Sequence, residues 1–269
     1  MKANVYSVEG KVAGEIELPA FFSLPVREDL IRRAVIAFQA NRRQQYGADP
    51  LAGKRTSAHY HGRRDLPPDQ RMMNRELARL PRIHGDCPPH LFLAARFAPQ
   101  AVKGRRAHPP KAEKKWEQKI NRKEKLLATL SAIAATAVKE LVKQRGHRYD
   151  GEVPIILQDD FENLSKAKDV ERVLLAIGME RELERAKKKK VRAGRGKMRG
   201  RRYRRKKSVL IVISSPDKPV KKACANLPGI DVVDALNLNA EHLAPGTHAG
   251  RLTIYTESAI EKLKERFGE

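Results

Sequence analysis

The stretch that most limits how this chain can fold runs from residue 42 to residue 111 and holds nine of the 16 prolines. Proline fixes φ and removes an amide donor, so neither a long helix nor a central strand can pass through Pro67-Pro68 or Pro88-Pro89. The stretch also carries 15 Lys/Arg and 5 Asp/Glu, a net charge of +10, and five of the eight histidines. A loop this long is unusual inside a compact domain. It is either a solvated, unstructured insertion or an arm that becomes ordered against a polyanion.

A second basic segment, 187–207, holds 14 Lys/Arg and no acidic residue, whereas 208–269 holds 7 Lys/Arg and 8 Asp/Glu. The formal charge of +24 is therefore concentrated in parts of the chain. Arginines at this density suit bidentate binding of phosphate oxygens. Tyr203 can stack on a base or pack on the domain. A disordered tract or a localisation signal is the simpler alternative, but 187–207 leads directly into the apolar run 209–213, which anchors its end.

Outside 42–111 the pattern predicts an α/β fold, with 1–41 and 112–269 forming one globular domain. Short strands are expected at 5–8 and 12–18, followed by a helix capped by Ser23 and ended by Gly47. A long helix is expected from about Ala112 to Gly146. Strands at 153–157, 209–213, 230–233 and 252–255 then alternate with helices at 165–178, 217–225 and 257–267, with Asn239 capping a short turn. This alternation favours a three-layer domain with a mostly parallel sheet covered by helices on both faces.

The candidate metal ligands form a weak pattern. His84, Cys87 and His90 are spaced three apart, with His59 and His61 upstream. A closed zinc site needs four ligands, and Pro88-Pro89 separates the cysteine from His90. We therefore expect no metal site, and assign these histidines to RNA contact or solvation. The two cysteines, Cys87 and Cys224, are too few and too far apart for a disulfide framework, which indicates a reducing compartment.

Other candidate catalytic patterns are equally incomplete. The segment Gly194–Lys197 lacks the spacing of a phosphate loop and follows no strand. Thr56 and Ser57 near His59 have no glycine elbow around them. Asp159-Asp160 follow a strand and are typical turn or helix-entry residues. We expect no enzyme, no cofactor and, since no apolar run approaches ~20 residues, no membrane span.

Several segments resemble ribosomal protein four of the large subunit, the universal L-four family, in its archaeal and eukaryotic form. They are PVREDLIRRAV, AFQANRRQQYGADPLAGKRTSA, QAVKGRRAHPPK and GKMRGRRYRRKKSVLIV, extended by DDFENL, NLNAEHLAPG and GRLTIYTESAI. The resemblance covers almost the whole chain. Because the long C-terminal extension of eukaryotic members is absent, the chain resembles an archaeal form.

The resemblance implies a globular domain on the outside of the large subunit and a long loop that penetrates ribosomal RNA. The loop tip would line a constriction of the peptide exit tunnel, opposite a loop of the L twenty-two family. The implied partners are large-subunit ribosomal RNA, neighbouring ribosomal proteins and, in passing, the nascent peptide, all in the cytoplasmic ribosome. Magnesium would enter only through the RNA. Segment 65–98 departs from the family pattern because it is longer than the loop tip of some members.

The residues expected to contact RNA are basic, aromatic or hydroxyl-bearing and fall into three groups. The first group, on the outgoing limb of 42–111, comprises Arg42, Arg43, Lys54, Arg55, Thr56, Ser57, His59, Tyr60, His61, Arg63 and Arg64. The second, on the returning limb and just beyond it, comprises Lys103, Arg105, Arg106, His108, Lys111, Lys114, Lys115 and Trp116. The third, within 187–207, comprises Arg192, Arg195, Lys197, Arg199, Arg201, Arg202, Tyr203, Arg204, Arg205, Lys206 and Lys207.

Two other classes of function remain open from the residues alone. A nucleic-acid enzyme on an α/β domain would need a glycine turn directly after a strand, and neither Ile213-Ser214-Ser215-Pro216 nor Leu157-Gln158-Asp159 supplies one. A non-ribosomal RNA-binding or nucleic-acid-condensing protein would carry its charge spread along tails. Charge confined to one arm and one tract favours the ribosomal interpretation.

Overall fold

The computed structural model describes residues 1–68, 71–73 and 75–268. The chain divides into two units, one formed by Met1–Arg42 and Glu117–Glu269 and the other by Arg43–Trp116. We call the first unit the domain and the second the loop. Among the described residues, no helix is both long and apolar enough to cross a membrane.

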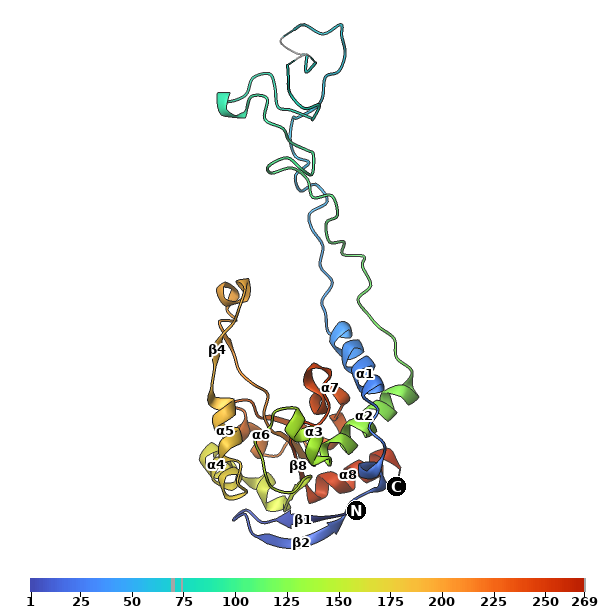
Figure 1. Ribbon diagram of the computed structural model, residues 1–269, viewed down its shortest axis with the longest axis vertical. Helices are drawn as coiled ribbons and strands as arrows, with labels where there is room; N and C mark the ends of the chain where they lie inside the picture. The colour runs from blue at the N-terminus through green and yellow to red at the C-terminus, as the bar shows by residue number, and fades with distance from the viewer. Residues whose placement is uncertain (69–70, 74, 269) are drawn as a thin grey trace. The chain divides into compact units, whose positions relative to one another are not determined.

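The domain is built on a six-stranded sheet in the order β2-β1-β3-β8-β6-β7 (Figure 1). Only β1 and β2 pair antiparallel, and the other neighbours are parallel. The predicted mostly parallel sheet is therefore confirmed. The strands are β1 (Lys2–Tyr6), β2 (Val12–Glu17), β3 (Ile155–Leu157), β6 (Leu210–Ile213), β7 (Asp231–Asp234) and β8 (Thr253–Thr256).

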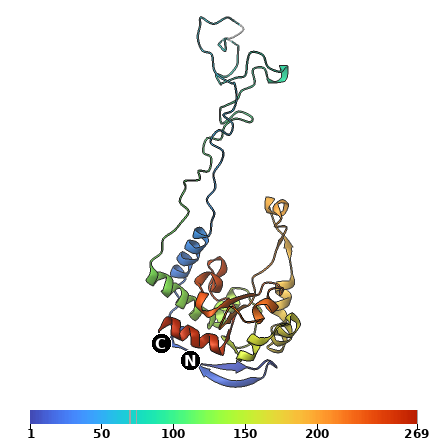
Figure 2. The same ribbon diagram turned by 180° about the vertical axis from the view of Figure 1, so that it is seen from behind.

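Helices cover both faces of the sheet, which makes the three layers. They are α1 (Glu28–Asn41), α2 (Arg122–Thr136), α3 (Lys139–Gln144), α4 (Ala167–Ala176), α5 (Glu180–Lys187), α6 (Val220–Cys224), α7 (Ala240–Leu243) and α8 (Glu257–Phe267). Blue α1, green α2 and red α7 and α8 pack on one face (Figure 2). Helices α3 to α6 pack on the other. The two faces account for the uninterrupted apolar strands, since a strand covered on both sides has no solvent-facing positions.

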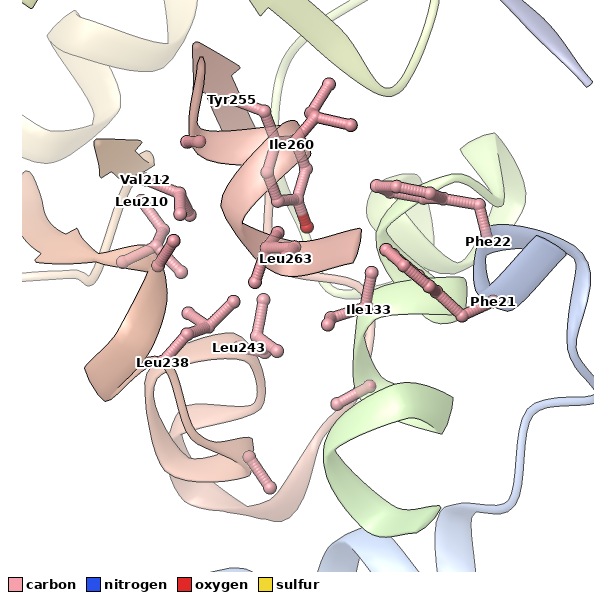
Figure 3. Close-up of a cluster of buried hydrophobic side chains, with 14 of the residues drawn as sticks. Phe21, Phe22, Ile133, Leu210, Val212, Leu238, Leu243, Tyr255, Ile260 and Leu263 are labelled. Carbon is pink, nitrogen blue, oxygen red and sulfur yellow. The ribbon is translucent and has the colours of Figure 1, made fainter. Parts of the chain in front are cut away.

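Strand β6 shows how both cores form from one run of sequence. Leu210 and Val212 belong to the cluster beneath α8, which Figure 3 shows together with Tyr255, Ile260 and Leu263. Ile211 and Ile213, with Val209 just before β6, belong to the cluster on the opposite face. Successive side chains of a strand point to opposite faces, and every one of these five is fully buried.

The predicted N-terminal helix is real, but its limits were wrong. Ser23 ends a short 3₁₀ turn, η1 (Ala20–Ser23), and α1 begins at Glu28. Phe21 and Phe22 of η1 are buried in the core, so packing rather than capping sets the conformation here. The helix ends at Asn41, well before Gly47. Glu28 and Asp29 supply the negative charge that favours a helix N-terminus.

The long helix expected from Ala112 to Gly146 was also wrong. Helix α2 starts only at Arg122, and it stops at Thr136 before the separate helix α3. The hydroxyl of Thr136 donates to the Ile133 carbonyl and contacts the Tyr255 hydroxyl at 3.0 Å. The extended Val138 then separates the two helices. Apolar periodicity in 112–121 was too short to outweigh its charge, and that segment is irregular.

The remaining elements agree with the sequence expectations to within a few residues, and α8 has the predicted limits. The Asn239 side chain caps α7, accepting from the amides of Glu241 and His242 at 3.0 and 3.1 Å. Helix α5 and a two-stranded hairpin, β4 (Lys190–Val191) with β5 (Tyr203–Arg204), were not predicted. Other short 3₁₀ turns are η2 (Pro89–Leu91), η3 (Asp159–Asn163), η4 (Arg195–Arg199), η5 (Ala235–Asn237) and η6 (Pro245–Thr247).

Candidate nucleic-acid interface

The basic tract 187–207 forms a hairpin rather than a disordered tail. Lys190 pairs with Arg204 and Val191 with Tyr203 in antiparallel register, and η4 closes the tip. The hairpin is the orange segment that continues from α5 in Figure 1. With only two residues in each strand, the hairpin is too short to be stable in isolation. It therefore depends on its attachment to the domain.

The cations of the hairpin face solvent. All predicted contact residues from 195 to 207 are exposed, and Arg192 is half-buried. Ion pairs with carboxylates occur at the two ends of the tract, Lys187 with Glu171 at 2.9 Å and Lys207 with Asp231 at 2.8 Å. Within the described part of the chain, no carboxylate lies within ion-pair distance of the cations between these ends. These cations are therefore available to an external polyanion.

A buried carboxylate fixes the base of the hairpin. Glu182 of α5 is fully buried, and its two oxygens accept from Arg185 at 2.6 and 2.8 Å. Ser208 Oγ and the Arg148 amide donate to the same carboxylate at 2.8 and 2.9 Å. Arg185 also donates to the Lys207 carbonyl at 2.9 Å, at the point where the hairpin enters β6. The end of the hairpin is thus hydrogen-bonded to the domain interior.

The charges in this network are set by their surroundings. Burial alone would raise the pKa of Glu182, but hydrogen bonds from Arg185 and His147 outweigh burial and leave the pKa well below its usual range. Burial lowers the pKa of His147, so its ring stays neutral and Nδ1–H donates to Glu182 at 2.8 Å. Arg185 is consequently the counter-ion of Glu182.

A second ion pair, between a buried arginine and a half-buried aspartate, also holds this segment. Arg251 is 1% exposed and donates to the Ser208 carbonyl at 2.8 Å and to Asp231 at 2.6 Å. Asp231 also accepts from Lys207 at 2.8 Å. Burial would raise the pKa of Asp231, but Arg251 and Lys207 lower it overall. Residues 207 and 208 therefore connect the hairpin to two buried charges.

A basic hollow of about 1080 Å³ lies between the hairpin base, α3 and η6. Nine Lys/Arg and a single acid, Glu28, line it. The cations are Arg145, Arg185, Lys188, Lys190, Arg192, Arg204, Arg205, Lys206 and Lys207. Burial, with Arg251 and Arg185 nearby, lowers the pKa of Arg145 to about 10, so it remains charged at neutral pH. A concave surface lined by one sign of charge concentrates the field that attracts phosphates.

The loop runs out and back as two adjacent limbs. The Ala48 amide donates to the Pro110 carbonyl at 3.0 Å. Further along, Gly53 has φ +73°, and a Cβ there would lie 2.6 Å from the Arg105 Cα. Only glycine fits this close approach of two backbones. Met72 and Ala98 are the only buried side chains among the described loop residues, so little apolar burial holds the loop together.

Most predicted contact residues of the loop are exposed, as an RNA-binding role requires. Arg105 and Trp116, with Thr56 and His61, are half-buried, and the others are exposed. Some cations already have partners: Arg55 pairs with Asp49 and Arg63 with Asp65. Arg42, in the domain, pairs with Glu241 of α7. These pairs are solvent-exposed on the arginine side and therefore weak.

Trp116 organises the ends of the two limbs. The Tyr46 ring stacks on it at 6.0 Å with an interplanar angle of 14°. Arg43 and Lys114 each lie 4.4 Å from its ring centroid. A hollow of about 770 Å³ is lined by Tyr46, Lys114 and Trp116, together with Arg106, His108 and Lys111. The loop thus presents an aromatic surface beside cations, the combination on which unpaired bases stack.

The histidines and the cysteine that were considered as metal ligands, and not expected to form a site, do not all come together. Of the residues described, only His59, His61 and His84 bring three possible ligand atoms together, within 4.8 Å of one another. Cys87 and His90 are not part of this group.

Two other residues considered in the sequence have structural surroundings. The Asp159 carboxylate accepts from the Ser258 amide and hydroxyl at 3.0 and 2.7 Å, at the start of α8. Cys224 is buried, which raises its pKa to about 12.

Sequence reasoning missed several residues of the hollow, namely Arg145, Arg185, Lys188 and Lys190. Arg145 lies outside the basic tract, and its carbonyl partners, Pro245 and His248, are distant in sequence. Lysines 188 and 190 were inside the tract but were not singled out. Arg185 could have been suspected from its i,i+3 spacing to Glu182.

Comparison with known proteins places the chain in a family. The sequence profile described as the Ribosomal protein L4/L1 family matches residues 16–266. The chain is 48% identical over 272 residues to the large ribosomal subunit protein uL4 of Methanopyrus kandleri, covering 100% of both chains. It is 50% identical over 266 residues to that of Archaeoglobus fulgidus, covering 98% of this chain and 99% of the relative. It is 48% identical over 269 residues to that of Haloquadratum walsbyi, covering 99% and 100%. With a matching profile across almost its whole length and relatives of equal length, this chain belongs to the Ribosomal protein L4/L1 family.

Proposed function

We propose that the chain is a structural protein of the large ribosomal subunit that binds ribosomal RNA through the hairpin and the loop. The observation that carries this proposal is the basic hollow, where nine cations face one acid at the hairpin base. Lys/Arg side chains that neutralise phosphates release counterions from the RNA, and this release drives binding. The buried Glu182 and Arg251 networks hold these cations in place before RNA arrives.

The loop performs the second part of this function by entering folded RNA. Its exposed arginines bind backbone phosphates, and Tyr46, Tyr60 and Trp116 offer faces for unpaired bases. RNA recognition rests on shape, backbone and stacking because the deep groove of an A-form helix is inaccessible to side chains. The tip lies in the peptide exit tunnel opposite a protein of the L twenty-two family, and the nascent peptide passes it. This placement rests on the family resemblance.

The protein has no catalytic role in this proposal. Phosphate binding by the hairpin and loop needs no cofactor, and magnesium enters with the RNA. Of the two adjacent carboxylates considered as catalytic candidates, Asp159 has a structural partner in Ser258. Neighbouring large-subunit proteins are the remaining partners.

The test measures binding of the full chain to large-subunit ribosomal RNA over a range of salt concentrations. The variant Arg204→Gln, Arg205→Gln, Lys206→Gln removes three exposed cations of the hollow. We expect the slope of log affinity against log salt to become shallower by about 2–3, since each phosphate contact contributes about 0.7–0.9. The matched control, Lys166→Gln, Lys168→Gln, Lys222→Gln, removes three exposed cations from α6 and the start of α4.

Equal salt slopes for the two triple variants would contradict the proposal, because binding would then depend on net charge alone. Equal affinity for unrelated RNA of the same length would favour a nucleic-acid-condensing protein. Crosslinks from the hairpin and the loop to a few sites in large-subunit ribosomal RNA are the result expected.

A further inference from the structure

Three histidines converge inside the loop from segments that are far apart in sequence. The ring centroids lie 4.0 Å apart for His59 and His61, 4.2 Å for His59 and His84, and 4.5 Å for His61 and His84. The rings are inclined to one another by 52°, 61° and 82°. One possible ligand atom from each lies within 4.8 Å of the other two. Their nitrogens therefore surround a common point.

Backbone pairing holds the three rings in this arrangement. His59 and Arg82 exchange amide hydrogen bonds at 3.3 and 3.0 Å across an antiparallel bridge. Arg82 is bridged in turn to Ala95. Side chains two residues apart on an extended segment point to the same face. His59 and His61 therefore lie on one face, and Arg82 and His84 lie on the same face of the paired segment. The His61 carbonyl also accepts from the Met72 amide at 3.2 Å.

Ordinary aromatic packing explains the contacts between the rings but not the lack of hydrogen-bond partners for two of their nitrogens. Nε2 of His61 and Nε2 of His84 are buried and have no hydrogen-bond partner among the described residues. Buried polar atoms in folded proteins are nearly always hydrogen-bonded, so each such atom needs an explanation. A cation that accepts the nitrogen lone pairs satisfies both atoms at once.

The third ring is already oriented as a ligand. His59 Nδ1 lies 2.8 Å from the Ser57 carbonyl, to which an Nδ1–H donates. This tautomer leaves Nε2 with a free lone pair. Metal-binding histidines usually donate their other ring N–H to a carbonyl or carboxylate in this way. His59 is exposed, which gives an ion a path to the cluster.

The protonation state also suits a metal. Desolvation and the positive influence of His59 lower the pKa of His61, and desolvation with both neighbouring histidines lowers the pKa of His84. Neutral imidazole is the form that binds a metal. Protonating these rings would place two or three positive charges within a few ångströms in an already basic loop.

We propose that His59, His61 and His84 form a zinc-binding site that joins the outgoing segment of the loop to segment 82–84. Three imidazoles suit zinc, with a water molecule completing the tetrahedron. Zn–N bonds of about 2.0–2.1 Å place ligand atoms about 3.3 Å apart, so the three nitrogens, which lie within 4.8 Å of one another, would move closer together when the ion binds. Imidazole ligands also suit copper and nickel, which the site would bind in vitro.

This site differs from the pattern considered in the sequence, where His84 was grouped with Cys87 and His90. A zinc ion here would close the loop between residues 59 and 84, in a unit that buries few apolar side chains. Metal binding of this kind contributes directly to folding because the site exists only in the folded segment. The site is independent of RNA contact by the hairpin.

The test titrates the full-length chain, free of RNA, with Co²⁺ and follows the visible absorption bands of tetrahedral cobalt, then displaces Co²⁺ with Zn²⁺. We expect one ion per chain. Single variants H59Q, H61Q and H84Q should each weaken binding by at least about tenfold, the loss typical of disturbing a metal site. Matched controls H90Q, H108Q and C87S change possible ligands in the same loop outside the cluster and should bind as the parent chain does.

Limited proteolysis of the same samples gives a second readout. Zn²⁺ should slow cleavage between residues 59 and 95 in the parent chain and in H90Q, and should have no effect in H84Q. An unchanged thermal transition of the domain in H84Q will show that the variant is folded. Full affinity in the triple variant H59Q/H61Q/H84Q, or the absence of saturable binding by the parent chain, would overturn the proposal.

Discussion

The hairpin and the loop are both strongly basic but are held by different means. The hairpin ends on residues 207 and 208, which contact two fully buried charged groups, Glu182 and Arg251. The described loop residues include only two buried side chains, Met72 and Ala98. A short basic hairpin thus has a preformed base, whereas a long basic loop relies on glycine contacts, prolines and exposed ion pairs.

The difference concerns when each element becomes ordered. A segment that cannot bury enough apolar surface to offset its conformational entropy becomes ordered on binding. The hairpin base is ordered by the domain, so in the proposed function its cations would bind RNA with little further loss of entropy. The loop, by contrast, would become ordered only on binding the proposed RNA or the proposed ion. Free protein should therefore show a protease-sensitive loop and a resistant domain.

The substitution Glu182→Ala is expected to have the largest effect on stability. The change leaves the buried His147 and the half-buried Arg185 without their shared acceptor, and breaking a buried ion pair typically costs about 3–5 kcal/mol. We expect the free energy of unfolding of the full chain, measured by urea denaturation, to fall by that amount. Glu184→Ala, on an exposed position of the same helix, is the control. A similar small loss in both variants would show that the network does not hold the hairpin base.

Lowering the pH is expected to have the next largest effect on stability. It should act on the carboxylates of the domain at the hairpin base and not on those of the loop. The pKa values of Glu182 and Asp231 are lowered in the folded domain, so the unfolded chain binds protons first as pH falls. Their contribution to stability is complete at neutral pH and is lost progressively below about pH 4, where unfolded carboxyls titrate.

This pH effect should be visible by urea denaturation at a series of pH values. Asp231→Asn should be less stable than the parent chain at neutral pH and should approach it in acid. Asp65→Asn, which removes an exposed loop carboxylate, should show the same pH dependence as the parent chain. A parent chain whose stability does not change between pH 7 and pH 3 would contradict the assigned directions.

The smallest expected effect comes from Gly53→Ala in the loop. The positive φ costs about 1–2 kcal/mol for an alanine, and its Cβ would also meet the Arg105 backbone at 2.6 Å. Gly85→Ala is a close control because Gly85 has φ +81° and open space around it. In the RNA-bound state, exchange of the Ala48 amide should accelerate more in Gly53→Ala than in Gly85→Ala. Equal exchange would mean that the two limbs do not depend on this contact.

Regular elements with one dominant signal were predictable from the sequence. The run 209–213 predicted a strand buried on both faces, and 257–267 predicted α8 with its observed limits. Asn239 has the expected capping role. In each case the local preference agrees with the tertiary environment, which is typical of natural sequences.

Features made by distant contacts could not be predicted in this way. Nothing in ERELERAK distinguishes Glu182 from its neighbours Glu180 and Glu184, yet only Glu182 faces His147 and Ser208. The histidine cluster depends on backbone contacts between segments distant in sequence, such as the bridge between residues 59 and 82. Ser23 and segment 112–121 both carry local helix signals. Core packing of Phe22 produces a 3₁₀ turn at the first position, and the charged residues around Trp116 leave the second segment irregular.

The position of strand β2 affects how readily the chain can aggregate. It lies at the edge of the sheet, so one side of its backbone has unpaired amide and carbonyl groups. Such an edge can template the addition of a strand from another molecule and so begin aggregation. Glu15 and Glu17 are exposed at alternate positions of β2, and an added strand would have to cover their charges. The charges of Glu15 and Glu17 at this border therefore oppose the addition of a further strand.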